Sequence, residues 1–280
     1  MADVSAKDVA ALRKVTGAGM MDCKKALIEN DNDQEAAVDW LRKQGLGASK
    51  RAGRSAEQGT VDVVLEENVA ALVELTCETD FVAKGADFVA TVAALAKLVA
   101  ENGEADLEHQ PFEGQTVGEA VALLVAKLGE KIELGRVARY ETTDGVLDGY
   151  KHIQNERGTI GVLVEVGGVD RSDPKAKELA HDLALHIASA APRFIRREDV
   201  SAEAIEKERE VLTELTRNEG KPEAAIGKIV EGRLNGFYKD YVLLEQGFVR
   251  DPKVSVGKLI EELAPKAEVR RFTRVKVGEE

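Results

Sequence analysis

The sequence predicts an α+β protein: a small three-helix N-terminal module, then two related hairpin-helix subdomains with an inserted antiparallel helical hairpin. The spacing of apolar residues predicts this class. Apolar residues recur at helical spacing through the first 45 residues and alternate as in strands from Thr60 onward. Within 200–246 they again recur at helical spacing, over a longer stretch. With 280 residues, the chain is long enough for about two domains of ~150 residues, each with a core.

The composition is acidic and poor in aromatic residues. The 39 basic and 51 acidic side chains give a formal charge of −12, and only 7 Phe, 4 Tyr and 1 Trp are present. The acidic balance argues against broad electrostatic binding to nucleic acid or to an anionic membrane. Few aromatic rings also argue against a base-stacking surface. A soluble partner, a small ligand or a reaction remains.

The sequence shows no secretory or membrane-spanning pattern. Five charged side chains in the first 14 residues are unlike a signal peptide, and the uncharged apolar stretch 88–96 is far shorter than the ~20 residues of a spanning helix. Cys23 and Cys77 are 54 positions apart and form no CxxC pair. We therefore expect two reduced thiols in a cytoplasmic protein.

Residues 1–46 form the predicted N-terminal module. Ser5 is placed to cap its first helix, which ends at Thr16-Gly17-Ala18-Gly19; the second covers 20–29, and the third stops at Gly45. The apolar positions expected at helical spacing are Val9, Leu12 and Val15 in the first helix, Met21 and Ile28 with Ala26 and Leu27 in the second, and Ala37, Trp40 and Leu41 in the third. Because so small a module has a thin core, we expect it to dock onto something.

A linker over residues 47–59 is predicted next. Its sequence, GASKRAGRSAEQG, is rich in Gly, Ala and Ser, as flexible connections are. Lys50, Arg51 and Arg54 are too few to favour the alternative of a nucleic-acid-binding patch.

The first hairpin-helix subdomain is predicted over residues 60–142. Its elements are, in order, strands over 60–66 and 69–77, a loop over 78–86, a helix with Phe88, Val92, Leu95, Ala96 and Val99 on one face, a second helix after Thr116, and a strand over 131–141. Glu67-Asn68 suits the hairpin turn between the first two strands. Glu119 stands three residues after Thr116, which is the spacing of a capping box.

The second subdomain, predicted over residues 143–199 and 247–280, repeats this plan. Its elements are a strand starting at Asp144-Gly145, a strand over 159–166, a helix over 175–190, a helix over 255–263 and a strand over 268–277. An offset of 91 positions pairs Leu72 with Leu163, Val73 with Val164, Glu74 with Glu165, Phe88 with Leu179, Val92 with Leu183, and Ala96 with Ile187. Matching of strand and helix faces at one offset indicates a duplicated unit.

Residues 200–246 are predicted to form the inserted hairpin, an antiparallel coiled coil. Its helices cover 201–218 and 222–241, and Gly220 closes the first while Pro222 suits a helix start. The apolar positions include Ile205, Leu212 and Leu215 in the first helix, and Ile226, Val230 and Leu234 in the second. This hairpin could present a working surface, mediate self-association or stabilise the second subdomain.

Motifs for catalysis are missing from the sequence. It holds no GxxxxGK followed by Ser or Thr, no GxGxxG between strand and helix, and no HExxH. His181 and His186 are five positions apart on a helix, so they lie on different faces and do not form a shared metal site. We therefore predict no enzyme, no cofactor and no metal site.

The segment Thr79-Asp80-Phe81-Val82-Ala83-Lys84 breaks the local pattern. Phe81 is a large apolar ring between polar neighbours, after a buried strand and before a helix. It could fold back onto the helix as a hydrophobic staple. It could instead be a ring presented beside a carboxylate, suited to wedging into a partner. Cys77, at the end of the strand, is interpreted as a small buried hydrophobe.

Several motifs resemble the bacterial elongation factor Ts family. The longest is Arg13-Lys14-Val15-Thr16-Gly17-Ala18-Gly19-Met20-Met21-Asp22-Cys23-Lys24-Lys25-Ala26-Leu27. The others are the segment Thr79–Lys84, Asp199-Val200-Ser201-Ala202-Glu203, Gly220-Lys221-Pro222 and Val230-Glu231-Gly232-Arg233. They are long, rare, in the family's order, and cover nearly the whole chain. Gly85, where the family often has Asn or Asp, and the end at Glu280 without an extra C-terminal helix depart from its pattern.

This resemblance implies a guanine-nucleotide exchange factor for elongation factor Tu, the GTPase that carries aminoacyl-tRNA to the ribosome. The loop matching Thr79, Asp80, Phe81 and Val82 would disturb the partner's Mg²⁺ and phosphate site and promote GDP release. In the family, the N-terminal module docks on the GTPase domain, and the segment around His152 touches another domain. The residues expected to dock are Leu12, Arg13, Thr16, Gly17, Gly19, Met20, Met21 and His152.

Two other classes of function stay open from the residues alone. An enzyme could use Glu78 and Asp80 as an acid/base or metal-binding pair, but the sequence offers no third ligand or histidine nearby. A non-catalytic adaptor or chaperone-like protein could work through the helical hairpin over 200–246. Release of labelled GDP from elongation factor Tu would separate all three.

Overall fold

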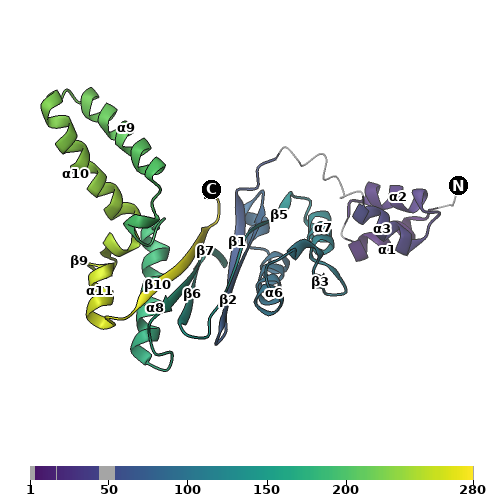
Figure 1. The fold of residues 1–280 in the computed structure, drawn as a ribbon. Helices are drawn as coiled ribbons and strands as arrows, with labels where there is room; N and C mark the ends of the chain where they lie inside the picture. The colour runs from purple at the N-terminus through teal and green to yellow at the C-terminus, as the bar shows by residue number, and fades with distance from the viewer. Residues whose placement is uncertain (1–3, 17, 44–53, 280) are drawn as a thin grey trace. The chain divides into compact units, whose positions relative to one another are not determined.

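The computed structural model describes residues 4–16, 18–43 and 54–279, and its fold is α+β, as predicted (Figure 1). Residues 44–53, with Gly45 and most of the predicted linker, lie outside the described residues, as does Gly17. The chain forms two compact units: the residues up to Tyr140 with Lys151–Gly161 and those from Val275 on, and Glu141–Tyr150 with Val162–Arg274. Among the described helices, none is both long and apolar enough to cross a membrane.

The N-terminal module has the three predicted helices, α1 (Ala6–Thr16), α2 (Met20–Glu29) and α3 (Gln34–Lys43). A capping box starts α1: Ser5 Oγ accepts from the Asp8 N–H at 3.2 Å, and an Asp8 carboxylate oxygen accepts from the Ser5 N–H at 3.1 Å. The buried core of the module comprises Val9, Leu12, Ala18, Cys23, Ala26, Leu27, Ala37 and Leu41.

Two predicted apolar faces of this module are right only in part. Val15 is 74% exposed, because the buried face of α1 runs through Val9, Leu12 and Thr16. In α2, Met21 and Ile28 are exposed, and the buried positions are Cys23, Ala26 and Leu27. Val9 and Leu12 of α1 and Ala26 and Leu27 of α2 lie on the predicted faces and are buried, with Thr16 and Cys23 beside them.

The first sheet contains β1 (Gln58–Leu65), β2 (Val69–Cys77) and β5 (Ile132–Glu141), in the order β1-β2-β5. The β1–β2 pair is antiparallel, with Val63 opposite Leu72, and the last two residues of the predicted linker, Gln58 and Gly59, belong to β1. Helix α6 (Ala86–Asn102) packs on β1 and β2 through the predicted apolar face. The capping box of Thr116 and Glu119 starts α7 (Val117–Leu128), as predicted.

The sequence did not reveal the short elements of this unit. The predicted loop 78–86 contains the helix α5 (Asp80–Ala83). Between α6 and α7 lie the 3₁₀ turn η2 (Leu107–His109) and two short strands, β3 (Pro111–Phe112) and β4 (Gln115–Thr116). Elements of two to four residues contain too few positions to display a hydrophobic period, so periodicity could not detect them.

The second sheet contains β6 (Val146–Gln154), β7 (Arg157–Gly167) and β10 (Glu268–Lys276), in the order β10-β7-β6. Helix α8 (Pro174–Ala190) starts at the capping residue Asp173, and α11 (Val256–Leu263) starts at Ser255. The short elements here are η3 (Arg197–Asp199), η4 (Leu243–Glu245), β8 (Gly247–Phe248) and β9 (Asp251–Ser255). Both three-stranded sheets place the second strand of the hairpin in the middle, and every residue paired by the offset of 91 is buried.

The inserted hairpin consists of α9 (Ala202–Asn218) and α10 (Glu223–Tyr241), which lie side by side and antiparallel (Figure 1). Its buried positions include Ile226, Val230 and Leu234 on α10. Leu215 was predicted to line α9, but it is exposed, and Thr216 is buried in its place. The buried Thr216 hydroxyl donates to Leu212 O at 2.6 Å, so the hydroxyl is paired inside the helix.

Candidate functional site

The first candidate site is α5, which presents the Phe81 ring to solvent. The Phe81 side chain is 77% exposed, although it is apolar and flanked by a buried strand and a buried helix face. The staple interpretation is therefore wrong, because a staple would bury the ring. Thr79 caps α5 by accepting from the Val82 N–H at 3.3 Å, and Ala83 at its other end is buried. The four-residue helix thus holds an exposed ring at a sheet end.

The lysine that lies over the Phe81 ring also pairs with Asp80. The Lys84 ammonium lies 4.7 Å from the centroid of the Phe81 ring and 3.6 Å from an Asp80 carboxylate oxygen. Spacings of three and four residues bring these side chains onto one side of a helical turn. Exposed contacts of this kind contribute little stability, at most about 1 kcal/mol each. Their effect is to place a cation and a carboxylate beside an apolar ring.

Buried side chains hold the two ends of α5. The Thr60 hydroxyl, from β1, donates to Ala83 O at 2.6 Å, which satisfies a carbonyl at the end of the helix. The Cys77 thiol donates to Thr79 O at 3.2 Å. Burial raises the pKa of the Cys77 thiol to about 12, so this cysteine stays protonated and acts as a small hydrophobe, as predicted.

The second candidate site is a surface groove of about 610 Å³ between α1 and α2. It is lined by Val4, Ala6, Val9, Ala10, Arg13, Lys14, Met20, Met21 and Lys24. Met20 is 60% exposed and Met21 is 75% exposed, so two flexible thioethers stand free of the core of the module. Apolar walls with three cations at the edge suit a protein surface that is apolar and acidic.

Two residues predicted to dock have buried side chains. Leu12 is fully buried, and Thr16 is buried with its hydroxyl donating to Leu12 O at 2.8 Å. Both side chains belong to the core that α1, α2 and α3 share, and their direct contact with a partner stays a prediction. Gly19 is the N-cap of α2, and a Cβ there would lie 2.9 Å from a carboxylate oxygen of Asp22.

The remaining predicted contact is exposed and has an apolar neighbour that the sequence reasoning missed. His152 is exposed near the end of β6, and the adjacent Ile153 is 62% exposed. An isoleucine among polar residues in this segment (YKHIQNER) was a signal of the same kind as Phe81. Among the described residues, no three His, Cys, Asp or Glu side chains are grouped so that they could hold a metal ion.

Comparison with known proteins defines the class as a translation elongation factor. A family model described as "Elongation factor TS" matches residues 78–279. Proteins named "Elongation factor Ts" from Streptomyces avermitilis and Streptomyces coelicolor are 49% and 48% identical over 287 residues; a third, from Micrococcus luteus, is 44% identical over 284. Each alignment covers 99% of this chain and all of the relative.

The chain therefore belongs to the elongation factor Ts family. Its role is that of a nucleotide exchange factor in translation elongation. The family model starts at Glu78, so it includes the whole of α5, while the three-helix module lies in the part that only the full-length relatives match.

Proposed function

We propose that this chain binds elongation factor Tu in its GDP-bound form and promotes release of GDP, so that GTP can bind. In this proposal the chain catalyses no chemical reaction and acts in the cytoplasm. The observation that carries it is the exposed Phe81 ring on a short helix whose two ends are fixed. An apolar ring that contributes little to its own core is available to a partner.

Exchange requires a difference in affinity rather than a reactive group. Mg²⁺ and backbone donors around the phosphates hold the nucleotide on a GTPase of this class. A protein that binds the nucleotide-free GTPase more tightly than the GDP-bound form shifts the population toward release. The coupling is reciprocal: the exchange factor lowers the affinity of the GTPase for nucleotide, and bound nucleotide lowers its affinity for the exchange factor to the same extent. To move the ratio of the nucleotide-free to the GDP-bound form from 1:99 to 99:1, the exchange factor must bind the nucleotide-free form about 10⁴-fold more tightly.

In the proposal, docking on the partner and release of its nucleotide are carried out by different surfaces. The groove between α1 and α2, with Met20, Met21 and Arg13, docks on the GTPase, and His152 makes a second contact. Phe81 then inserts between helices of the partner beside its phosphate site, with Asp80 close to the Mg²⁺. The inserted ring, and the repulsion between the Asp80 carboxylate and the phosphates of the nucleotide, favour the form of the partner that has lost its nucleotide.

Release of labelled GDP from elongation factor Tu tests the proposal directly. The dissociation rate is measured at rising concentrations of this protein, with excess unlabelled nucleotide to prevent rebinding. We expect the rate to rise and then saturate as the complex forms. No acceleration at any concentration would overturn the exchange function.

The hairpin supports a second role, self-association of this chain. Val211 and Leu215 lie one turn apart on α9, and both are exposed. Two apolar side chains on one helix face fit a contact with an identical face. Sedimentation of the wild type against a variant with both residues changed to Lys tests this role, and equal masses at all concentrations would contradict it.

A further inference from the structure

Two glutamates connect the start of α5 to the turn between α7 and β5. Glu130 Oε2 accepts from the backbone N–H of Glu78 at 3.1 Å and of Thr79 at 3.0 Å. Glu130 Oε1 accepts from the Thr79 hydroxyl at 2.5 Å. In return, Glu78 Oε1 accepts from the Lys131 N–H at 2.6 Å. Each carboxylate therefore binds the backbone beside the other.

We infer that Glu130 is a positioning residue that orients Phe81 for nucleotide exchange, an inference that rests on the proposed function. The path is short. A Thr79 hydroxyl that donates its only hydrogen to Glu130 keeps its lone pairs for the Val82 N–H, which it caps at 3.3 Å. Because that hydrogen bond starts α5, the direction of the helix, and with it the Phe81 ring, depends on Glu130.

The fixed start matters because α5 cannot form by itself. Forming the first turn of a helix is unfavourable, and a helix of four residues adds almost no further hydrogen bonds to offset it. The exposed Phe81 side chain contributes no core contacts that could hold the turn in its place. Hydrogen bonds to an ionised carboxylate are roughly twice as strong as neutral ones, so Glu130 supplies much of the missing order.

Glu78 fixes the opposite side of the same junction. Arg54 Nη1 lies 3.2 Å from both carboxylate oxygens of Glu78, while Lys131 supplies a backbone donor. This carboxylate is therefore occupied, which argues against its use as a free acid or metal ligand beside Asp80. Because the start of α5 is held in advance, less conformational entropy is lost when Phe81 inserts into the docked partner.

The test compares Glu130→Ala with the matched control Glu133→Ala. Glu133 is three residues further on, its side chain is about half exposed, and its carboxylate pairs with the Lys131 ammonium at 2.8 Å. At saturating protein we expect Glu130→Ala to lower the maximal rate of GDP release at least about tenfold. The concentration for half-maximal rate stays at the wild-type value, because the groove between α1 and α2 is intact. Glu133→Ala keeps both values.

A double variant separates positioning from a general loss of structure. If Glu130 acts only through Phe81, adding Glu130→Ala to Phe81→Ala lowers the maximal rate no further. A further loss, or an unchanged maximal rate in Glu130→Ala alone, overturns the inference. Wild-type protein that fails to accelerate release overturns the proposed function instead, so the two failures are distinguishable.

Two conservative variants keep the inference testable if Glu130→Ala unfolds. Glu130→Gln retains one acceptor oxygen for the two N–H groups, so we expect a rate between those of wild type and Glu130→Ala. Thr79→Val removes the hydroxyl but keeps the volume, and it should lower the maximal rate as well. Hydrogen exchange gives a readout without the partner: the Thr79 and Val82 amides should exchange faster in Glu130→Gln. Unchanged amide protection overturns the inference.

Discussion

Glu74 and Glu165, 91 positions apart, are both buried in the middle strand of a three-stranded sheet, and each binds an arginine of the third strand. Glu74 in β2 accepts from Arg136 Nε of β5 at 3.0 Å. Glu165 in β7 accepts from Arg271 Nε of β10 at 2.6 Å. A buried carboxylate is costly unless it is paired and hydrogen-bonded. Both copies of the unit therefore keep the same pair.

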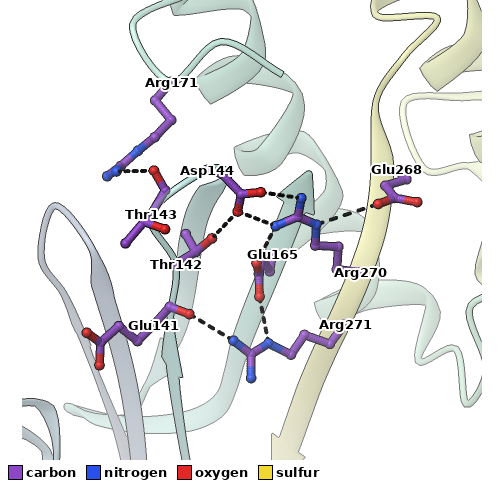
Figure 2. A network of polar contacts seen from close by, with 9 residues as sticks. All are labelled: Glu141, Thr142, Thr143, Asp144, Glu165, Arg171, Glu268, Arg270 and Arg271. Carbon is purple, nitrogen blue, oxygen red and sulfur yellow. Dashed lines mark hydrogen bonds and ion pairs between the residues drawn. The ribbon is translucent and has the colours of Figure 1, made fainter. Parts of the chain in front are cut away.

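The pair in the second sheet belongs to a larger network (Figure 2). Arg271 binds one carboxylate oxygen of Glu165, and Arg270 Nη1 binds the other at 3.2 Å while also donating to Asp144 at 2.6 Å. Burial by itself would raise the pKa of Glu165. Hydrogen bonds from Arg271, Thr142 and Arg270 outweigh burial and hold that pKa below its usual 4.5. The folded chain therefore favours the ionised form.

Glu165→Gln should lower the free energy of unfolding at pH 7 by about 1–3 kcal/mol, because it weakens charge-assisted hydrogen bonds. The pKa in the fold is lower than in the unfolded chain. The stabilisation by the ionised Glu165 carboxylate is therefore complete above about pH 4.5. It disappears as the pH falls through the lower pKa that Glu165 has in the fold. Urea unfolding at pH 7 and below pH 4 measures it. A stability difference that stays constant on acidification would contradict the prediction, and Glu133→Gln serves as the exposed control.

Phe81→Ala should leave stability within about 0.5 kcal/mol of wild type, since the ring is 77% exposed. It should nevertheless lower the maximal rate of GDP release from elongation factor Tu strongly, because the inserted ring is lost. Thermal unfolding and the labelled-nucleotide assay check the two parts. Leu263→Ala removes another exposed apolar side chain, on α11, and should leave the rate unchanged. Equal rates for Phe81→Ala and wild type would refute the wedge.

Met20→Ala and Met21→Ala should weaken docking without changing the rate inside the complex. Both side chains line the groove between α1 and α2 and are mostly exposed. The expected result is a higher concentration for half-maximal exchange, with the same maximal rate and melting temperature. Cys23→Ala is the contrasting control, because Cys23 is fully buried in the same helix and should lower the melting temperature. Early melting of the methionine variants would assign them to the core.

Regular elements were predictable because their signals are local. The capping box at Thr116 and Glu119 needs only residues three apart, and the buried face of α6 follows from helical spacing. The exposed ring at Phe81 could be suspected for the same reason, since it violates the pattern around it. Such arguments do not extend to contacts between distant segments. The reciprocal binding of Glu78 and Glu130 joins residues 52 positions apart and leaves no periodic trace.

The correspondence between the two predicted units also extends further than periodicity could show. Gln110 and Gln246 are 136 positions apart, because the helical hairpin is inserted in the second copy only. Both side-chain amides donate to a carbonyl at the end of the long helix that follows the strand hairpin, Gly103 O after α6 and Ala190 O in α8, each at 3.1 Å. An offset of 91 misses this pair, since an insertion changes the register of every later residue.

His186 is a buried titratable group whose hydrogen bonds define its neutral form. Its Nε2 lies 3.0 Å from Gln246 Oε1, and its Nδ1 accepts from the Val249 N–H at 3.1 Å. The hydrogen of the neutral ring is therefore on Nε2. A second proton on Nδ1 would face another N–H donor. Burial lowers the pKa of His186 below its usual 6.5, although the Gln246 hydrogen bond opposes this shift.

His186→Leu should therefore change how stability depends on pH. In the wild type the unfolded chain binds a proton near pH 6.5 that the fold excludes, so stability falls as the pH drops below this value. Leucine, which the first copy has at Leu95, cannot bind that proton. It leaves Gln246 Oε1 and the Val249 N–H without the partner that His186 supplies, so we expect a loss of about 1–3 kcal/mol at pH 7.5.

The difference between the two proteins should narrow at pH 5, because other groups titrate alike in both and only the wild type loses stability through His186. Urea unfolding at the two pH values gives the four free energies. An equal stability difference at pH 7.5 and pH 5 would show that the His186 ring is protonated as readily in the fold as in the unfolded chain. The Val249 N–H would then have to turn away from Nδ1 when the ring is charged.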